Sequence, residues 1–152
     1  MGEDATAIIV AAGSGRRMGF DKLFADLGGE PVLARTLRAF HACEAVSEII
    51  VVAAEARAGE VASLAANIGA GKVAAAIPGG AERHQSVWRG IQAASPESAL
   101  LAVHDGARPL IAPEAIARCL AAAAERGAAA CARPVADTMM RADAEEPGDR
   151  AR

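Results

Sequence analysis

Residues 7–22 read AIIVAAGSGRRMGFDK, and this stretch indicates both the fold and the chemistry of the chain. Its apolar start predicts a buried strand. The strand runs into Ala11-Ala12-Gly13-Ser14-Gly15, a segment that carries almost no side-chain bulk. Backbone N–H groups in such a segment can approach a phosphate chain or a base closely. The cations Arg16, Arg17 and Lys22 follow at once and can meet negative charge, so the stretch predicts the front of a nucleotide-binding site.

The glycine spacing separates this loop from two common nucleotide-binding motifs. The pattern over residues 13–19 is G-x-G-x-x-x-G, whereas the dinucleotide fingerprint is G-x-G-x-x-G with a helix directly after it. The G-K-[ST] end of a Walker loop is absent as well. A glycine-rich turn after a strand is by itself as often structural as functional, but Arg17 and Lys22 have no obvious structural partner and favour a function. Lys22 stands out further, because the chain has two lysines against fourteen arginines.

The composition indicates a single domain without a nucleic-acid surface. The chain has 152 residues, the size of one domain, and 53% of them are hydrophobic, which is enough for a buried core. The net charge of −3 argues against a broad basic face for nucleic acid.

The same composition favours a cytoplasmic protein that does not enter a membrane. No apolar run reaches the roughly 18 residues that span a bilayer, and the acidic residues Glu3 and Asp4 are unlike a secretion signal. The three cysteines, Cys43, Cys119 and Cys131, form no C-x-x-C pair, so neither a zinc site nor a disulfide framework is indicated.

Strand-like runs alternate with helical periodicity along the chain, which is the pattern of an α/β fold. Predicted strands cover about residues 5–11, 48–53, 72–77, 99–103 and 128–133, with shorter extended pieces at 23–27 and 135–141. Predicted helices begin near Pro31 and cover about residues 58–68, 82–94 and 113–127. The helix over 82–94 is expected to bury Val87, Ile91 and Ala94. We expect one domain over residues 1–141 and a charged tail over residues 142–152.

Three loops follow three of these strands, at residues 13–22, 79–86 and 104–109. In open α/β sheets, ligands bind beyond the carboxyl ends of the strands. We therefore expect the three loops to meet at that edge and to build one site.

The second of these loops contains Gly79-Gly80 and leads into a helix. One interpretation is a tight turn with helix-start chemistry. The other is a wall for a base and a ribose, in which the backbone of the glycine pair and the hydroxyl of Ser86 bind the base. His84 by itself indicates no more than a surface histidine.

The third loop reads His104-Asp105-Gly106-Ala107-Arg108-Pro109. A carboxylate at a strand end beside a glycine is well placed to hold Mg²⁺, which prefers oxygen ligands and substrate phosphates. The alternative is a pair between Asp105 and Arg108 that stabilises the turn, with His104 as a packed neighbour. Further on, nothing in the local spacing makes Asp137-Thr138 more than an ordinary strand start.

Together these motifs resemble the 2-C-methyl-D-erythritol 4-phosphate cytidylyltransferases of the non-mevalonate isoprenoid pathway, with the related ribitol-5-phosphate cytidylyltransferases. The segments that carry the resemblance follow the family's order, at about its intervals, over nearly the whole chain. They are Ala11-Ala12-Gly13-Ser14-Gly15-Arg16-Arg17-Met18-Gly19, Lys22, Gly79-Gly80-x-x-Arg83-x-x-Ser86-Val87, His104-Asp105-Gly106-Ala107-Arg108-Pro109 and Pro134-Val135-Ala136-Asp137-Thr138.

The resemblance implies a Rossmann-like nucleotidyltransferase α/β domain, with a mostly parallel central sheet and helices on both faces, that binds CTP and Mg²⁺. Arg17 and Lys22 match the family's pair of residues that bind the triphosphate and stabilise the transition state, and Asp105 matches its metal-binding carboxylate. By position, the nucleotide-binding residues are Ala11, Ala12, Gly13, Ser14, Gly15, Gly79, Gly80, Arg83 and Ser86. The residues that match the family's binding site for methylerythritol phosphate are Ala107, Arg108 and Thr138.

The chain departs from the family's pattern in two respects. The family usually has Pro-Lys-Gln around the catalytic lysine, where this chain has Asp21-Lys22-Leu23, so we expect a changed loop shape with the chemistry retained. Family members also continue well beyond position 152 and carry a later carboxylate, lysine and arginine without a counterpart here. We therefore expect residues 142–152 to be a charged tail or the start of an incomplete dimerisation arm, in a chain truncated at its C-terminus.

The reaction implied by the resemblance is an in-line attack of the acceptor's phosphate on the α-phosphorus of CTP, with pyrophosphate leaving. The implied partners are CTP, a sugar-alcohol phosphate and, in the family, a second copy of the chain, with a monomer as the alternative here. Three other functions stay open. They are transfer to another acceptor such as ribitol phosphate, CTP binding without catalysis, and a folded fragment without a function of its own.

Overall fold

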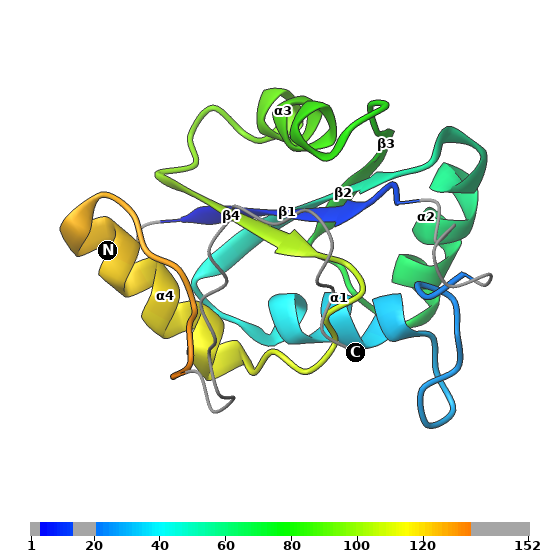
Figure 1. Cartoon of the computed structure of the whole chain (residues 1–152), viewed down its shortest axis with the longest axis horizontal. Coiled ribbons are helices and arrows are strands. Elements are labelled where there is room, and N and C mark those ends of the chain that lie inside the picture. The colour runs from blue at the N-terminus through cyan, green and yellow to red at the C-terminus, as the bar shows by residue number, and fades with distance from the viewer. Residues whose placement is uncertain (1–3, 14–20, 135–152) are drawn as a thin grey trace, which may run out of the picture.

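The computed structural model describes residues 4–13 and 21–134, which form a sheet covered by helices on both faces (Figure 1). The strands are β1 (Ala5–Ala11), β2 (Val46–Ala53), β3 (Val73–Pro78) and β4 (Leu100–Asp105). The helices are α1 (Val32–Ala42), α2 (Ala58–Asn67), α3 (Arg83–Ala93) and α4 (Pro113–Arg126), with a short 3₁₀ turn at Glu55–Arg57 before α2. No helix in these two ranges is long and apolar enough to cross a membrane.

All pairs in the sheet are parallel, and the strand order is β3-β2-β1-β4. The chain moves outward from β1 to β2 and β3, and then returns to the other side of β1 to form β4. The direction of winding therefore reverses between β1 and β4. Open α/β sheets bind ligands in the crevice outside the carboxyl ends of the strands at such a reversal.

Strand β1 is buried on both faces because its side chains alternate between two layers. Ala7 and Ile9 belong to the larger core, which is filled by α1, α2 and α4. Ile8 points to the opposite face and joins a smaller core beside α3. Figure 1 shows this division, with α3 alone on one face and α1 and α4 on the other. The predicted α/β class with helices on both faces is thus confirmed.

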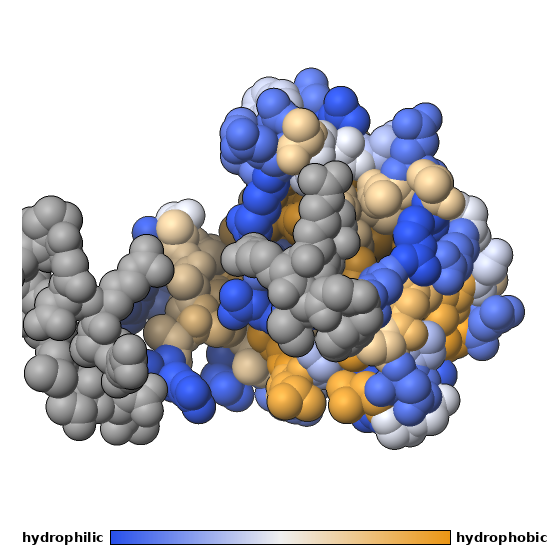
Figure 2. All heavy atoms as spheres, turned by 45° about the vertical axis from the view of Figure 1, so that its right-hand side comes forward, coloured by the Kyte–Doolittle hydropathy of each residue, from blue (hydrophilic) through white to orange (hydrophobic). Residues whose placement is uncertain are grey.

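Helix α3 lies unusually close to the sheet because Gly90 faces it. A Cβ at Gly90 would overlap Cγ2 of Ile8 and lie 3.1 Å from Cγ2 of Val52. The prediction that Val87, Ile91 and Ala94 are buried is wrong, since all three are only half-buried. Helix α3 alone cannot cover the whole width of the sheet face on which it lies. The side of α3 that faces away from the sheet is hydrophilic (Figure 2).

Several helix and strand ends agree with the sequence pattern. Strand β1 has the predicted bounds, and α1 begins directly after Pro31. Helix α4 begins at Pro113 and ends at Gly127, whose φ of 86° is a left-handed conformation that favours glycine.

Two predicted extended segments are wrong. Residues 128–133 form no strand, and residues 23–27 contribute only an isolated bridge between Asp26 and Pro31. A strand needs a neighbour to pair with, and the run over 128–133 instead returns along α4, where the Cys131 thiol lies 3.9 Å from the Ala115 carbonyl oxygen. The predicted extended piece at 135–141 and the tail over 142–152 lie outside the described residues.

We expect Gly90→Ala to lower the free energy of unfolding by about 1–3 kcal/mol, because the added methyl group overpacks the contact between α3 and β1. Urea denaturation followed by circular dichroism measures this change. Gly59→Ala is the matched control, because a Cβ at this position in α2 has no heavy atom within 4 Å. The control is expected to be neutral or slightly stabilising. Equal effects of the two substitutions would contradict the packing argument.

Candidate functional site

The loops after β1, β3 and β4 all begin at the carboxyl edge of the sheet, where β1 and β4 are adjacent and β2 lies between β1 and β3. The N–H of Gly106 donates to the carbonyl of Val10 at 2.8 Å, which joins the β4 loop to the end of β1. The N–H of Gly79 donates to the carbonyl of Ala53 at 2.8 Å, which joins the β3 loop to the end of β2. The carboxyl edge therefore holds the beginnings of all three loops that the sequence singled out.

The glycine pair after β3 lies against the turn after β1. A Cβ at Gly79 would overlap the Cβ of Ala12 and lie 2.9 Å from the hydroxyl oxygen of Ser86, while a Cβ at Gly80 would overlap Gln85. Glycine is thus required at both positions by close approach. The structure brings Ala12, Gly79, Gly80 and Ser86 together, and no described residue lies within 4 Å of a Cβ built on Gly13.

Hydrogen bonds inside the second loop favour the helix-start interpretation of its local shape. Ser86 is 2% exposed, and its hydroxyl accepts from the Gly80 N–H at 3.0 Å and donates to the Glu82 carbonyl at 3.3 Å. Glu82 and Gln85 complete a capping box at the start of α3. The N–H groups of both glycines are engaged, so the glycine pair itself offers a ligand its carbonyl lone pairs, although the Gly79 carbonyl already accepts from Nη1 of Arg89 at 2.7 Å.

Asp105 lies at the end of β4 between two guanidinium groups. Arg83, the first residue of α3, donates from Nε and Nη2 to Oδ1 at 3.2 and 2.8 Å. Arg108 donates from Nε to Oδ2 at 2.9 Å. Burial alone raises the pKa of Asp105, but the hydrogen bonds and charges of Arg83 and Arg108 outweigh it, so the pKa lies below its ordinary value of 3.8. Asp105 is therefore a carboxylate at neutral pH.

The donor set fits a divalent cation that shares its ligands with a nucleotide. Among the described residues, no group of three or more His, Cys, Asp or Glu side chains is placed to hold a metal ion. Mg²⁺ needs no such cage, since it commonly takes one or two carboxylates together with phosphate oxygens and water. The ionised Asp105 would supply such an oxygen if one of the arginines released it.

Helix α1 supports the loop after β4 from below, and sequence reasoning missed this support. Thr36 is fully buried, and its hydroxyl donates to the Gly106 carbonyl at 2.8 Å. His104 packs its ring 4.9 Å from that of Phe40, and its Nε2 lies 3.1 Å from the Arg108 carbonyl oxygen. His104 is thus a packed neighbour of the site. The only signal in the sequence was a threonine beside the apolar stripe of α1.

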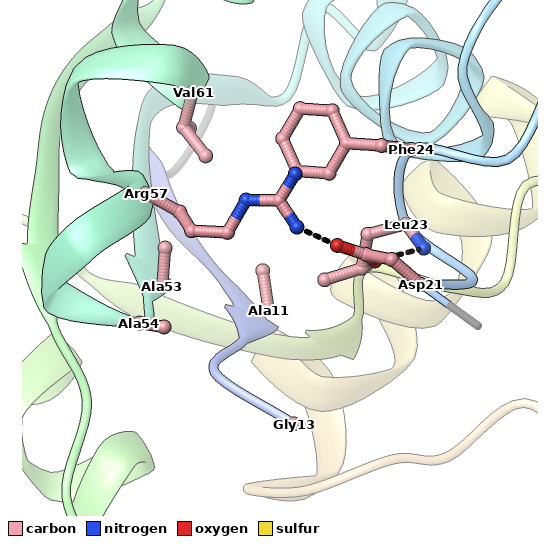
Figure 3. Close-up of a pocket in the computed structure, with 9 residues that line it drawn as sticks. All are labelled: Ala11, Gly13, Asp21, Leu23, Phe24, Ala53, Ala54, Arg57 and Val61. Atoms are coloured by element: carbon pink, nitrogen blue, oxygen red, sulfur yellow. Dashed lines mark hydrogen bonds and ion pairs between the residues drawn. The ribbon is translucent and has the colours of Figure 1, made fainter. Parts of the chain in front are cut away.

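A cavity of about 220 Å³ opens at the ends of β1 and β2. It contains Ala11 and Gly13 from the predicted nucleotide residues, but none of those after β3 or β4. It is therefore not the common cleft that the sequence predicted for the three loops. Arg57, which the sequence analysis did not single out, crosses it (Figure 3).

The remaining predicted site residues divide into two groups. Lys22, Ala107 and Arg108 are exposed at this edge. Ser14, Gly15, Arg16, Arg17 and Thr138 lie outside the described residues. The roles assigned to all of these residues stay predictions.

Comparison with known proteins identifies one family. The family model for 2-C-methyl-D-erythritol 4-phosphate cytidylyltransferase matches residues 5–148. A protein with that name from Symbiobacterium thermophilum is 45% identical over 137 residues, which cover 88% of this chain and 56% of that protein. Its namesake from Pelotomaculum thermopropionicum is 42% identical over 139 residues, which cover 90% of this chain and 58% of that protein. The chain thus spans a little over half the length of these relatives.

Two solved structures with the same fold are of proteins named 4-diphosphocytidyl-2C-methyl-D-erythritol synthase. A crystal structure of 4-diphosphocytidyl-2C-methyl-D-erythritol synthase from Anaerococcus prevotii superposes with a TM-score of 0.70 at 30% identity, over 82% of this chain and 52% of that one. Another structure of a synthase of this name has a TM-score of 0.73 at 27% identity, over 96% of this chain and 67% of that one.

We expect Asp105→Asn to lower the free energy of unfolding at about pH 7 by about 0.2–1 kcal/mol, because the ion pairs are partly exposed. A lowered native pKa means that the carboxylate contributes fully above its ordinary pKa of 3.8 and loses this contribution as the pH falls through the native value. Urea unfolding at a series of pH values measures the difference between the two proteins. That difference should shrink on acidification, and a constant difference would contradict the ion-pair assignment. Glu44→Gln, at an exposed site, is the control.

Proposed function

Because the chain belongs to the 2-C-methyl-D-erythritol 4-phosphate cytidylyltransferase family, we propose that it binds CTP and transfers its cytidylyl group to 2-C-methyl-D-erythritol 4-phosphate, releasing pyrophosphate. One observation carries this proposal. A side-chain-free wall at Gly79 and Gly80 and an arginine-bound carboxylate at Asp105 lie at the same edge of a parallel sheet, beside its reversal point.

The chemistry of the wall after β3 supports an amino-bearing base. The N–H groups of Gly79 and Gly80 are already bonded to Ala53 and Ser86, so the glycine pair offers a ligand the Gly80 carbonyl and the remaining lone pair of the Gly79 carbonyl, which also accepts from Arg89. The 4-amino group of cytosine is a hydrogen-bond donor, whereas the corresponding group of uracil is an acceptor. The wall therefore suits cytosine better than uracil.

The positive side chains around this edge suit the triphosphate. Arg83 and Arg108 already hold one anionic group, the carboxylate of Asp105, and guanidinium groups bind phosphate with the same geometry. Lys22 extends from the end of the first loop and is exposed. In this proposal Lys22 and Arg17 bind the triphosphate, and Arg108, Ala107 and Thr138 help hold the acceptor.

The reaction needs no covalent intermediate with the protein. The acceptor's phosphate oxygen attacks the α-phosphorus of CTP in line with the leaving pyrophosphate, so the protein orients two anions and neutralises the charge that grows on the oxygens. Lys22 and Arg17 would supply the positive charge that neutralises it. Mg²⁺ bound at Asp105 and at phosphate oxygens would lower the repulsion between the substrates.

Two further statements belong to the same proposal. The reduced cysteines, Cys43, Cys119 and Cys131, fit a cytoplasmic protein. A second copy of the chain completes the acceptor site in this proposal, with a monomer as the alternative outcome of a sedimentation experiment.

A pyrophosphate-release assay with CTP and either methylerythritol phosphate or ribitol phosphate tests the proposed function. Faster release with methylerythritol phosphate supports it, and faster release with ribitol phosphate identifies the other acceptor. CTP binding in calorimetry without pyrophosphate release would indicate a nucleotide-binding module instead. If CTP does not bind at all, the proposal is wrong.

We expect Lys22→Ala to lower turnover by a factor of about 10²–10³, because it removes a preorganised charge that acts mainly in the transition state. The affinity for CTP should change much less. Steady-state kinetics and CTP titration on the same variant separate the two effects. Lys72→Ala is the matched control, because Lys72 lies next to the amino end of β3, where its Nζ bonds the Cys43 carbonyl at 2.8 Å. Equal losses of turnover and binding in Lys22→Ala would contradict the assigned role.

A further inference from the structure

Arg57 joins the start of α2 to the end of the first loop. Its guanidinium group forms an ion pair with the carboxylate of Asp21 and lies 4.0 Å over the ring of Phe24. Its Nε also donates to Glu60 at 2.7 Å. Figure 3 shows the side chain reaching across the cavity from α2 to these two residues.

Two of the residues that Arg57 contacts, Asp21 and Phe24, flank the proposed catalytic lysine in the sequence. Asp21 directly precedes Lys22, and Phe24 follows it by two positions. The Leu23 N–H donates to Oδ1 of Asp21 at 3.0 Å, and the Leu23 carbonyl accepts from the Leu33 N–H at 2.9 Å. The backbone directly after Lys22 is thus held by two hydrogen bonds, and the side chain of Asp21 directly before it is held by Arg57.

The Lys22 side chain itself has no such restraint. It is exposed, and no acidic residue of the described chain forms an ion pair with it. Where the ammonium group lies therefore depends on where its backbone is held. Arg57 contacts the side chains of both Asp21 and Phe24 and so holds residues on either side of Lys22.

We propose that Arg57 is a positioning residue for Lys22, which it fixes at the nucleotide edge through the ion pair with Asp21 and the stack on Phe24. This inference rests on the proposed function, because it assigns a purpose to the place of Lys22. Arg57 touches no reacting atom. Its effect is to hold the lysine in one geometry before the substrates arrive, and a displacement of about 1 Å at a reacting group can cost a factor of 10² in rate.

The chemistry of this link requires arginine. A planar guanidinium group can stack on an aromatic ring while its edge binds two carboxylates, as Arg57 does with Phe24, Asp21 and Glu60. A lysine ammonium is a compact charge with tetrahedral donors and cannot make both kinds of contact at once. Arg57→Lys therefore keeps the charge and loses the geometry.

The first measurement is independent of activity. Amide hydrogen exchange of the unliganded chain, read by mass spectrometry, compares the wild-type protein with Arg57→Gln. We expect exchange over residues 22–24 to become faster in the variant, while exchange within β1 and β2 stays unchanged. Arg38→Gln is the control, because Arg38 also pairs with a glutamate, Glu30, at 3.1 Å, but from α1. Unchanged exchange over residues 22–24 in Arg57→Gln would overturn the proposal.

The second measurement separates positioning from stability. In the pyrophosphate-release assay, we expect Arg57→Gln to lower kcat by a factor of about 10–100 while the Kd for CTP changes little. Arg57→Lys should restore only part of the loss. Adding Asp21→Asn to Arg57→Gln should cost little more, because the two side chains act through one link. A kcat equal to that of the wild-type protein, at the same folded fraction, would overturn the positioning role and leave the proposed function intact. A wild-type protein that binds no CTP would instead overturn the proposed function, and with it the purpose assigned to Arg57.

Discussion

The whole arrangement depends on the burial of β1. This strand pairs with β2 on one side and with β4 on the other, and its two faces are covered by different helices. A segment enclosed on four sides has a fixed position at its carboxyl end. The Val10 carbonyl accepts a hydrogen bond from Gly106, and Ala12 lies against Gly79. The loops that follow β3 and β4 therefore take their positions from β1.

Charge is organised around the same edge in two separate links, each of which joins residues far apart in the sequence. Arg83 at the start of α3 binds Asp105 at the end of β4, and Arg57 directly before α2 binds Asp21 near the end of the first loop. In both links the start of a helix supplies the cation. Each link ties the edge of the sheet to the start of a helix.

The sequence was sufficient wherever a local pattern has one structural meaning. The apolar run of β1 and the stop at Gly127 are of this kind, since buried strands and left-handed helix ends each have a strong residue preference. The sequence was not sufficient to predict contacts between residues that are far apart along the chain. No local sequence pattern predicts that Arg83 binds Asp105. Nor does one predict that α3 packs so closely on the sheet at Gly90 that a larger residue would not fit there. Residues 128–133 show the reverse case, because an alanine-rich run that was predicted as a strand forms none without a partner strand to pair with.

The exposure of the cluster at Asp105 makes this edge sensitive to ionic strength. The side chains of Arg83 and Arg108 are 60% and 73% exposed, and at physiological ionic strength charges at the surface are screened beyond about 8 Å. Added salt weakens the hold of both arginines on the carboxylate and weakens their attraction for a phosphate at the same time. The first effect frees the carboxylate for a cation, whereas the second weakens the binding of the phosphate that would share that cation. The strength of the ion pairs at this edge therefore depends on the buffer. It differs between a low-salt solution and the ionic strength of a cell.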